Sequence, residues 1–118
     1  MKVLLDNCVH YRAGRLFPGH DVSHCRDMGW RELENGDLLA AAASASFDAL
    51  VTTDKKVRYE HRLDSLPIAV VEIDTLFTRL VDLESVAFAF DEALEATRSF
   101  LFVSIGEDGR IEHVTPRG

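Results

Sequence analysis

The sequence predicts an α/β domain in which helices cover both faces of a mainly parallel β-sheet. Short apolar runs alternate with stretches that are long enough for crossover helices. A Gly-Glu-Asp-Gly turn near the end of the chain separates two further β-rich runs, as expected for a β-hairpin. The 118 residues match the length of one domain, so we assign 1–118 to a single domain.

Four short apolar runs and the hairpin supply the predicted strands. Each run is bounded by Asp, Pro or Gly, which are typical of strand ends and turns. The expected strands are 2–5, 20–25, 47–53 and 68–71, and the hairpin strands are 100–105 and 110–114. Because parallel strands are covered on both faces, near-continuous apolar runs of this kind fit the interior of such a sheet.

Helices are expected between these strands. The expected segments are 9–16, the Leu/Ala-rich run that follows Asp37, and 55–63. No Gly or Pro occurs between Pro67 and Gly106, so one long helix is expected there, starting somewhere in 75–82. Its apolar stripe repeats at helical spacing. The stripe consists of Leu76, Leu80, Leu83, Ala87, Phe90 and Leu94. Phe88 and Phe90 cannot lie on the same side of one helix, which indicates a second apolar surface or burial on two sides.

Charge is distributed unevenly along the chain. The net charge is −7; residues 1–62 are neutral, with nine basic and nine acidic residues, and 63–118 carry four basic and eleven acidic residues. A protein that coats nucleic acid by charge alone is therefore excluded. The N-terminal segment lacks a secretory apolar core, and Cys8 and Cys25 form no CxxC motif. We expect a cytoplasmic protein with reduced thiols.

Acidic residues mark one edge of the predicted sheet. Asp6 and Asp54 each end an apolar run, and Asp37 opens a helix. Because the carboxyl ends of parallel strands meet at one edge, we expect these three carboxylates to lie together. Magnesium or manganese would relieve their repulsion and could activate water at a phosphodiester. Asp is also common at strand ends and helix starts for purely structural reasons.

Several segments resemble the PIN-like domain family, in particular a short bacterial branch. Segment 1–9 is similar to the opening of these domains, where an acid ends the first strand. Segment 35–40 resembles the Asn-Gly-acid-Leu-Leu helix start, and 47–54 ends in the Thr-x-Asp pattern. Arg58-Tyr59, 66–71 and the hairpin are also similar. The resemblance spans nearly the whole chain and implies a PIN-like three-layer α/β/α fold with a C-terminal β-hairpin.

The resemblance also implies an activity. Proteins of this branch are generally regarded as toxin-like ribonucleases of toxin–antitoxin operons. It therefore implies a magnesium- or manganese-dependent ribonuclease, with a small antitoxin protein as partner. Asp6, Asp37 and Asp54 are carried across as catalytic residues and metal ligands, with Asn7 and Thr53 in supporting positions.

Two positions depart from the family pattern. Asn7 stands where a second acid often follows the first, and Lys56 stands where many PIN domains have a fourth acid. With three acids, one metal is more plausible than two. A catalytically weakened PIN-like domain that binds RNA or protein is the alternative function. A response-regulator-like phosphoacceptor would need an acid pair near the start and a late Lys, and residues 63–118 contain no Lys.

Basic and aromatic residues follow Asp54 directly. Lys55, Lys56, Arg58 and Tyr59 are predicted to bind RNA, with the basic groups on phosphates and the tyrosine on a base. The alternative is a solvated basic helix face. The acidic half, 63–118, is expected to face a basic protein partner or a second copy in a homodimer.

Overall fold

The computed structural model describes residues 1–117 and confirms the α/β class. One six-stranded sheet runs through it in the order β2-β1-β3-β4-β5-β6. Neighbouring strands are parallel except β5 and β6, which form the antiparallel hairpin. The strands are β1 Lys2–Leu5, β2 Asp21–His24, β3 Ala49–Thr52, β4 Ala69–Ile73, β5 Phe100–Ile105 and β6 Ile111–Pro116.

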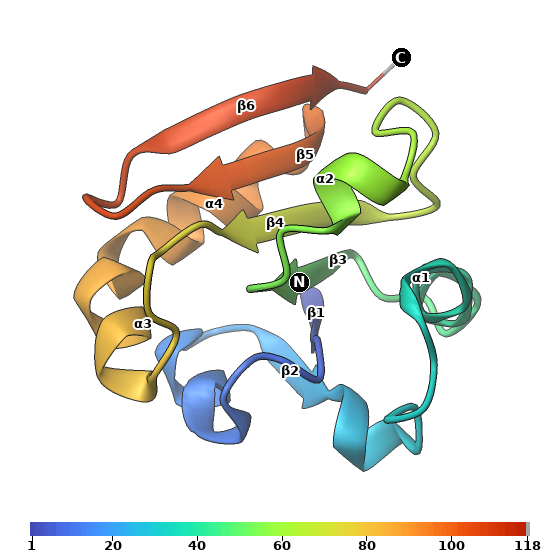
Figure 1. The fold of residues 1–118 in the computed structure, drawn as a ribbon, viewed down its shortest axis with the longest axis horizontal. Helices are drawn as coiled ribbons and strands as arrows, with labels where there is room; N and C mark the ends of the chain where they lie inside the picture. Colours follow the sequence, from blue (N-terminus) through green and yellow to red (C-terminus); the bar gives the residue numbers. More distant parts are fainter. Residues whose placement is uncertain (118) are drawn as a thin grey trace.

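Helices lie on both faces of this sheet, which is compatible with a three-layer α/β/α arrangement. Figure 1 shows α1 on one side of the row of strands and α3 on the other. The α-helices are α1 Asn35–Ser44, α2 Val57–Glu60, α3 Leu80–Val86 and α4 Phe90–Ala96. Short 3-10 helices are η1 Tyr11–Leu16, η2 Cys25–Met28 and η3 Ala87–Ala89.

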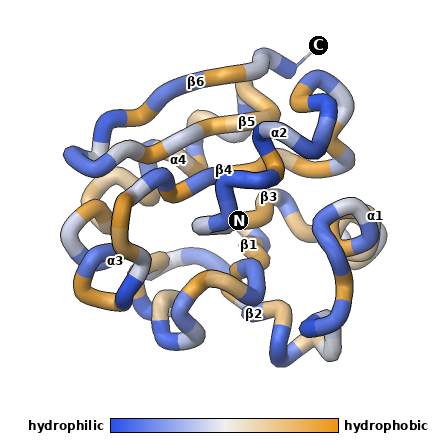
Figure 2. Tube along the Cα trace, viewed as in Figure 1, coloured by the Kyte–Doolittle hydropathy of each residue, from blue (hydrophilic) through white to orange (hydrophobic). Residues whose placement is uncertain are grey.

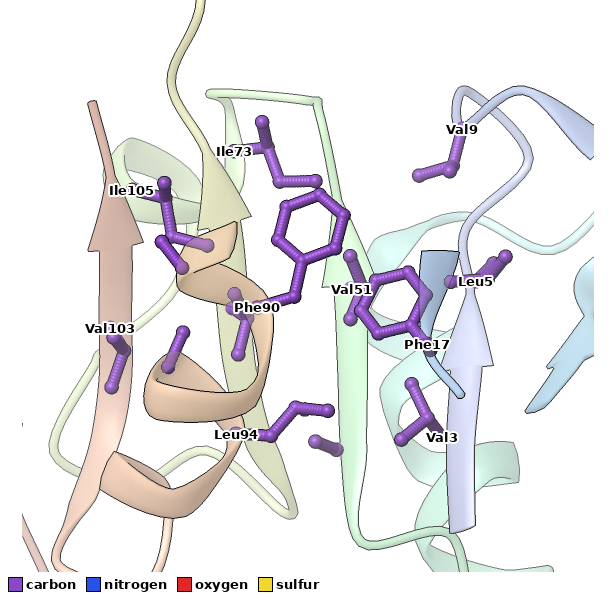
Figure 3. Close-up of a cluster of buried hydrophobic side chains, with 14 of the residues drawn as sticks. Val3, Leu5, Val9, Phe17, Val51, Ile73, Phe90, Leu94, Val103 and Ile105 are labelled. Atoms are coloured by element: carbon purple, nitrogen blue, oxygen red, sulfur yellow. The ribbon is translucent and has the colours of Figure 1, made fainter. Parts of the chain in front are cut away.

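The strands separate two hydrophobic cores because successive side chains point to opposite faces. Val3 and Leu5 of β1 belong to the core under η1, α3 and α4, whereas Leu4 belongs to the core under α1 and α2. In the first core the rings of Phe17 and Phe90 stack with centroids 4.6 Å apart (Figure 3). Figure 2 shows hydrophobic residues in the interior strands β1 and β3 and hydrophilic residues in the loops around them.

The prediction of one long helix after Pro67 is wrong in two respects: the helix begins late and is interrupted. The chain leaves β4 in extended form, because the Asp74 amide donates to the Ile105 carbonyl and the Leu76 amide donates to the Glu107 carboxylate. The helix begins only at Leu80, where the Arg79 amide donates to Asp82 Oδ2 (3.0 Å). It then tightens into η3 before α4 continues. Leu76, expected on the buried stripe, is 75% exposed.

Two further expectations change. The helix expected at 55–63 is the single turn α2, because the chain becomes extended at His61. The C-terminal hairpin is present as expected, and β5 pairs with β4 in parallel, so the hairpin extends the sheet. Phe88 and Phe90 do lie on different sides, with Phe90 buried and Phe88 74% exposed.

The hairpin turn contacts this second apolar surface at Gly109. Gly109 has φ +80°, and a Cβ built on it would lie 2.2 Å from Phe88 Cζ, so a side chain there would be strained and would clash. Phe88 therefore lies against the hairpin turn. Within residues 1–117, no helix has both the length and the apolar character needed to cross a membrane.

Candidate functional site

Polar side chains form a row across the carboxyl ends of the parallel strands. Thr52 of β3, Glu72 of β4 and Ser104 of β5 are register partners, and all three are buried. Two residues before each of them lies an apolar side chain of the α1/α2 core, so the row points to the same face. Asp6 follows β1 directly and joins the row through Thr52. The sheet thus turns from apolar to polar at the edge where open α/β sheets bind ligands.

Asp6 and Asp54 are tied to the same threonine. Thr52 Oγ1 donates to Asp6 Oδ2 (2.8 Å) and accepts from the Asp54 amide (3.0 Å). Asp6 is 5% exposed, and its Oδ1 accepts from the Asn7 amide (2.7 Å). These hydrogen bonds fix the Asp6 carboxylate and place the start of the 54–56 loop beside it. Thr52 therefore holds the Asp54 backbone close to the Asp6 carboxylate.

Asp54 is held more loosely than Asp6. Its Oδ1 accepts from the Lys56 amide (2.9 Å), and within residues 1–117 no hydrogen bond reaches its Oδ2. An open hollow of about 350 Å³ at the start of α1 is bordered by Asp54, Lys56, Asn35 and two further acids, Glu34 and Glu60. One carboxylate oxygen of Asp54 is therefore available to a ligand.

Asp37 lies in the first turn of α1 and is exposed. No hydrogen bond within residues 1–117 joins it to Asp6 or Asp54. Among these residues, the structure also assembles no group of three or more His, Cys, Asp or Glu side chains in a metal-binding arrangement. Thr52 therefore links the Asp6 carboxylate to the backbone of Asp54, and Asp37 has no such link in the described residues.

The two supporting residues fix the loops around Asp6. Asn7 Nδ2 donates to the carbonyls of Trp30 and Arg31 (3.4 and 3.3 Å), which ties the loop after β1 to the loop before α1. Thr53 Oγ1 donates to the Cys8 carbonyl (3.3 Å). Both side chains hold backbone segments in place.

Glu72 is a buried acid that the sequence analysis did not select. Its side chain is 1% exposed, and Oε1 accepts from Arg58 Nη2 (2.8 Å) and from Ser104 Oγ (3.0 Å). Oε2 is buried, with no hydrogen-bond partner in the part of the chain described here. The sequence signal for this residue was a lone acid inside the apolar run 68–73. Arg58, expected to bind RNA, is thus engaged in an ion pair within the protein.

The other residues expected to bind RNA have different environments. Lys55 Nζ lies 3.3 Å from Asp74 Oδ1 and donates to the Thr75 carbonyl. Lys56 is exposed and forms no ion pair within residues 1–117, and Tyr59 is 82% exposed. Lys56 and Tyr59 therefore remain accessible from solvent, whereas Lys55 and Arg58 are neutralised by acids.

Cys8 lies next to this site. Its Sγ is 3.4 Å from Thr52 Oγ1. Burial of the thiol, and secondly the negative charge of Asp6, raise the pKa of Cys8. Burial also raises the pKa of Cys25 to about 12, with smaller contributions from Asp6 and Cys8. Both residues are free thiols, and both are protonated at neutral pH.

A larger open hollow of about 480 Å³ is bordered by Asn7 and Cys8. Its wall contains His10, Tyr11, Arg26 and Arg31. The edge of β1 and β3 is therefore flanked by two hollows, one at Asp54 and one beyond Asn7.

Comparisons with known proteins identify no relative. No family model matches the chain, no curated protein matches it, and no solved structure matches it. The functional argument therefore rests on the residues and their geometry.

Proposed function

We propose that this protein is a magnesium- or manganese-dependent ribonuclease of the PIN-like type. The observation that carries the proposal is the Thr52 hydroxyl at the carboxyl edge of the sheet, which bonds both the Asp6 carboxylate and the Asp54 backbone amide. Two carboxylates from adjacent strands, one rigid and one with a free oxygen, are a donor set for a hard divalent cation.

A pair of carboxylates suits Mg²⁺, because proteins rarely surround this ion with protein ligands alone. Mg²⁺ usually takes one or two carboxylates and keeps several waters or substrate phosphates. Asp6 and Asp54 would hold the ion, and the exposed Asp37 would reach it through water. A bound Mg²⁺ supplies charge neutralisation for a phosphodiester and increases the acidity of a coordinated water.

The residues around the metal site would have two kinds of role, positioning the acids and binding RNA. Thr52 holds Asp6 in one rotamer, and Asn7 and Thr53 fix the loops on either side. Lys56, which forms no ion pair within residues 1–117, would bind an RNA phosphate beside Asp54. Tyr59 would stack on a base. Lys55 would leave its ion pair with Asp74 and bind a phosphate instead. Arg58 would act mainly through its ion pair with Glu72.

The proposal includes a basic protein partner, as in a toxin–antitoxin pair. Segment 76–88 carries four large hydrophobic side chains that are each more than half exposed: Leu76, Phe77, Val81 and Phe88. We name these four residues the apolar patch. Glu107 accepts from the Leu76 amide, and Asp82 and Glu84 of α3 are paired with Arg79 and Arg15. Residues 63–118 carry eleven acidic and only four basic residues in all, so a basic partner complements this half, whereas a second copy of it would be repelled.

Binding of the neighbouring gene's product tests the partner. We expect Phe88→Ser to weaken binding at least tenfold in a calorimetric titration, because Phe88 is the most exposed ring of the apolar patch. Tyr59→Ser, in the basic half, is the matched control. A loss with Tyr59→Ser and none with Phe88→Ser would contradict the assignment.

The alternative is a weakened PIN-like domain that binds RNA without cleaving it. Asn7 and Lys56 favour it, because Asn7 contributes no negative charge and Lys56 places a positive charge near Asp54. The side-chain nitrogen of Asn7 also donates to the carbonyls of Trp30 and Arg31, which is a structural role.

A cleavage assay separates the two functions. Purified protein is incubated with labelled single-stranded RNA in Mg²⁺ and, separately, in EDTA. We expect cleavage in Mg²⁺ alone and none by Asp6→Asn. RNA that is bound but left intact by the wild-type protein in both Mg²⁺ and Mn²⁺ would contradict the ribonuclease and favour the alternative.

A further inference from the structure

Positive charge that has no acidic partner gathers on one side of the candidate site. Most arginines lie within 4 Å of a carboxylate, including Arg58, Arg79 and Arg98. Within residues 1–117, Arg12, Arg31 and Arg117 have no such partner, and Arg26 has only a 3.8 Å contact with Asp27. Arg12, Arg26 and Arg31 lie around η1, η2 and the loop before α1, whereas Arg117 donates to the Thr97 carbonyl at the other end of the chain. A group of three such arginines therefore lies beyond Asn7.

An aromatic stack holds one of these arginines in place. The rings of His10 and Tyr11 are stacked with centroids 4.9 Å apart. The Arg26 guanidinium carbon lies 4.3 Å from the centre of the Tyr11 ring, and that of Arg12 lies 5.4 Å from it. Cation–π contacts of this kind restrict the guanidinium and leave its N–H groups free to bind an anion. Tyr11 is itself 48% exposed at the surface.

These groups line one concave surface. The hollow of about 480 Å³ is bordered by Asn7, His10, Tyr11, Arg26 and Arg31, with Glu32 as its one acid. This volume lies in the range of small-molecule sites, ~300–1,000 Å³, and so can accept a nucleotide. Asn7 follows Asp6 directly, so the hollow begins next to the proposed metal ligands.

We propose that this hollow binds single-stranded RNA beside the cleavage site. The inference rests on the proposed function and adds to it the surface that holds the substrate. Arg26 and Arg31 bind phosphates. An unstacked base packs against the stacked rings of His10 and Tyr11. Glu32 accepts a hydrogen bond from a base amino group or a ribose hydroxyl. In the hollow at Asp54, whose wall also contains Glu34 and Glu60, Lys56 is the basic residue that binds the strand after it passes Asp6 and Asp54.

Single-stranded RNA fits this surface better than a duplex or a protein does. A duplex presents its phosphates on a convex surface and keeps its bases stacked, whereas this site is concave and offers aromatic and guanidinium planes. The apolar patch that suits a protein lies in segment 76–88 and does not border this hollow.

RNA binding in EDTA tests the proposal without cleavage. Fluorescence anisotropy of a labelled 12-nucleotide single-stranded RNA is measured with the wild-type protein and with Arg26→Gln/Arg31→Gln. Each phosphate contact contributes about 0.7 to the salt slope of log K, so two contacts are worth roughly 25-fold in affinity at 0.1 M salt. We expect the double variant to bind about 20-fold more weakly and its salt slope to fall by about 1.4.

Matched variants distinguish this surface from general charge. Arg62→Gln/Arg98→Gln removes the same charge from two exposed arginines elsewhere, and we expect less than a twofold change. Tyr11→Ala should weaken binding, and Tyr11→Phe should restore it because the ring is kept. All variants are compared by thermal unfolding so that only folded protein is scored.

The outcomes separate this inference from the proposed ribonuclease. Equal weakening by the two double variants, or an unchanged affinity of Arg26→Gln/Arg31→Gln, overturns the inference even if the protein cleaves RNA. RNA binding that depends on Arg26 and Arg31 in a protein that never cleaves RNA supports the inference and contradicts the ribonuclease. No measurable RNA binding by the wild-type protein overturns the inference.

Discussion

Acids at the two ends of the carboxyl edge differ in whether they have a positively charged partner. At β4 and β5, Glu72 is fully buried and its carboxylate is paired with Arg58 and bonded to Ser104. At β1 and β3, Asp6 and Asp54 receive only hydroxyl and backbone N–H groups. Within residues 1–117, neither of these aspartates forms an ion pair with a basic side chain.

The difference distinguishes a structural acid from an available one. A buried carboxylate that has its own arginine is already neutralised, and a metal would have to displace the guanidinium. The Asp6 and Asp54 pair has positioned oxygens and no counter-charge, so a divalent cation can supply that charge. The sheet edge therefore combines a closed ion pair with an open acidic pair.

The largest expected effect is the loss of cleavage at the open pair. We expect Asp54→Asn to lower the rate of Mg²⁺-dependent RNA cleavage at least about 100-fold, because removing a metal ligand costs at least as much as disturbing its supporting shell. A gel-based cleavage time course measures the rate. Asp64→Asn, which removes an exposed acid paired with Arg62, should change the rate less than about twofold. Equal losses in both variants would contradict the comparison.

The closed pair should instead control stability. Arg58→Ala leaves Glu72 buried without its cation, and we expect a loss of about 3 kcal/mol in the free energy of unfolding. Urea denaturation measures this loss. Adding Glu72→Gln to Arg58→Ala should recover part of it, because the uncompensated charge is removed. Arg62→Ala, whose ion pair with Asp64 is exposed, should cost less than about 1 kcal/mol. A small loss with Arg58→Ala would contradict the structural role.

The smallest expected effect is a change in the reactivity of Cys8. Burial and the charge of Asp6 raise the pKa of this thiol, so Asp6→Asn should lower the pKa and increase the thiolate fraction at pH 8. We expect alkylation by iodoacetamide to accelerate, because the thiolate is the reactive form. Mass spectrometry of the modified peptide measures the rate. Asp27→Asn is the control, and a slower reaction of Asp6→Asn would contradict the sign.

Much of the fold was readable from the sequence because strands need apolar residues on both faces. The short apolar runs at 2–5, 47–53 and 68–71 predicted strands because they are too short for buried helices. The Gly-Glu-Asp-Gly turn predicted the hairpin. The break between α3 and α4 was not readable, because Ala87 and Ala89 are good helix formers and no Gly or Pro marks the 3-10 turn. The late helix start depends on contacts with Glu107, which lies about 30 residues away.

The candidate site was readable only in part for a similar reason. An acid after a strand predicts the sheet edge, which is why Asp6 and Asp54 could be selected. Their link through Thr52 depends on strand order, which single-sequence spacing does not contain. The inward direction of Arg58 depends on the partner Glu72, 14 residues later. The free arginines of the N-terminal half emerge only once every other ion pair is known.

Titration with Mn²⁺ followed by electron paramagnetic resonance tests the central claim most directly. The account predicts that the wild-type protein binds one Mn²⁺, that Asp6→Asn and Asp54→Asn each lose this binding, and that Glu72→Gln, once shown to be folded, retains it. Binding that survives Asp54→Asn, or that is lost in folded Glu72→Gln, would contradict the assignment of the open acidic pair as the metal site.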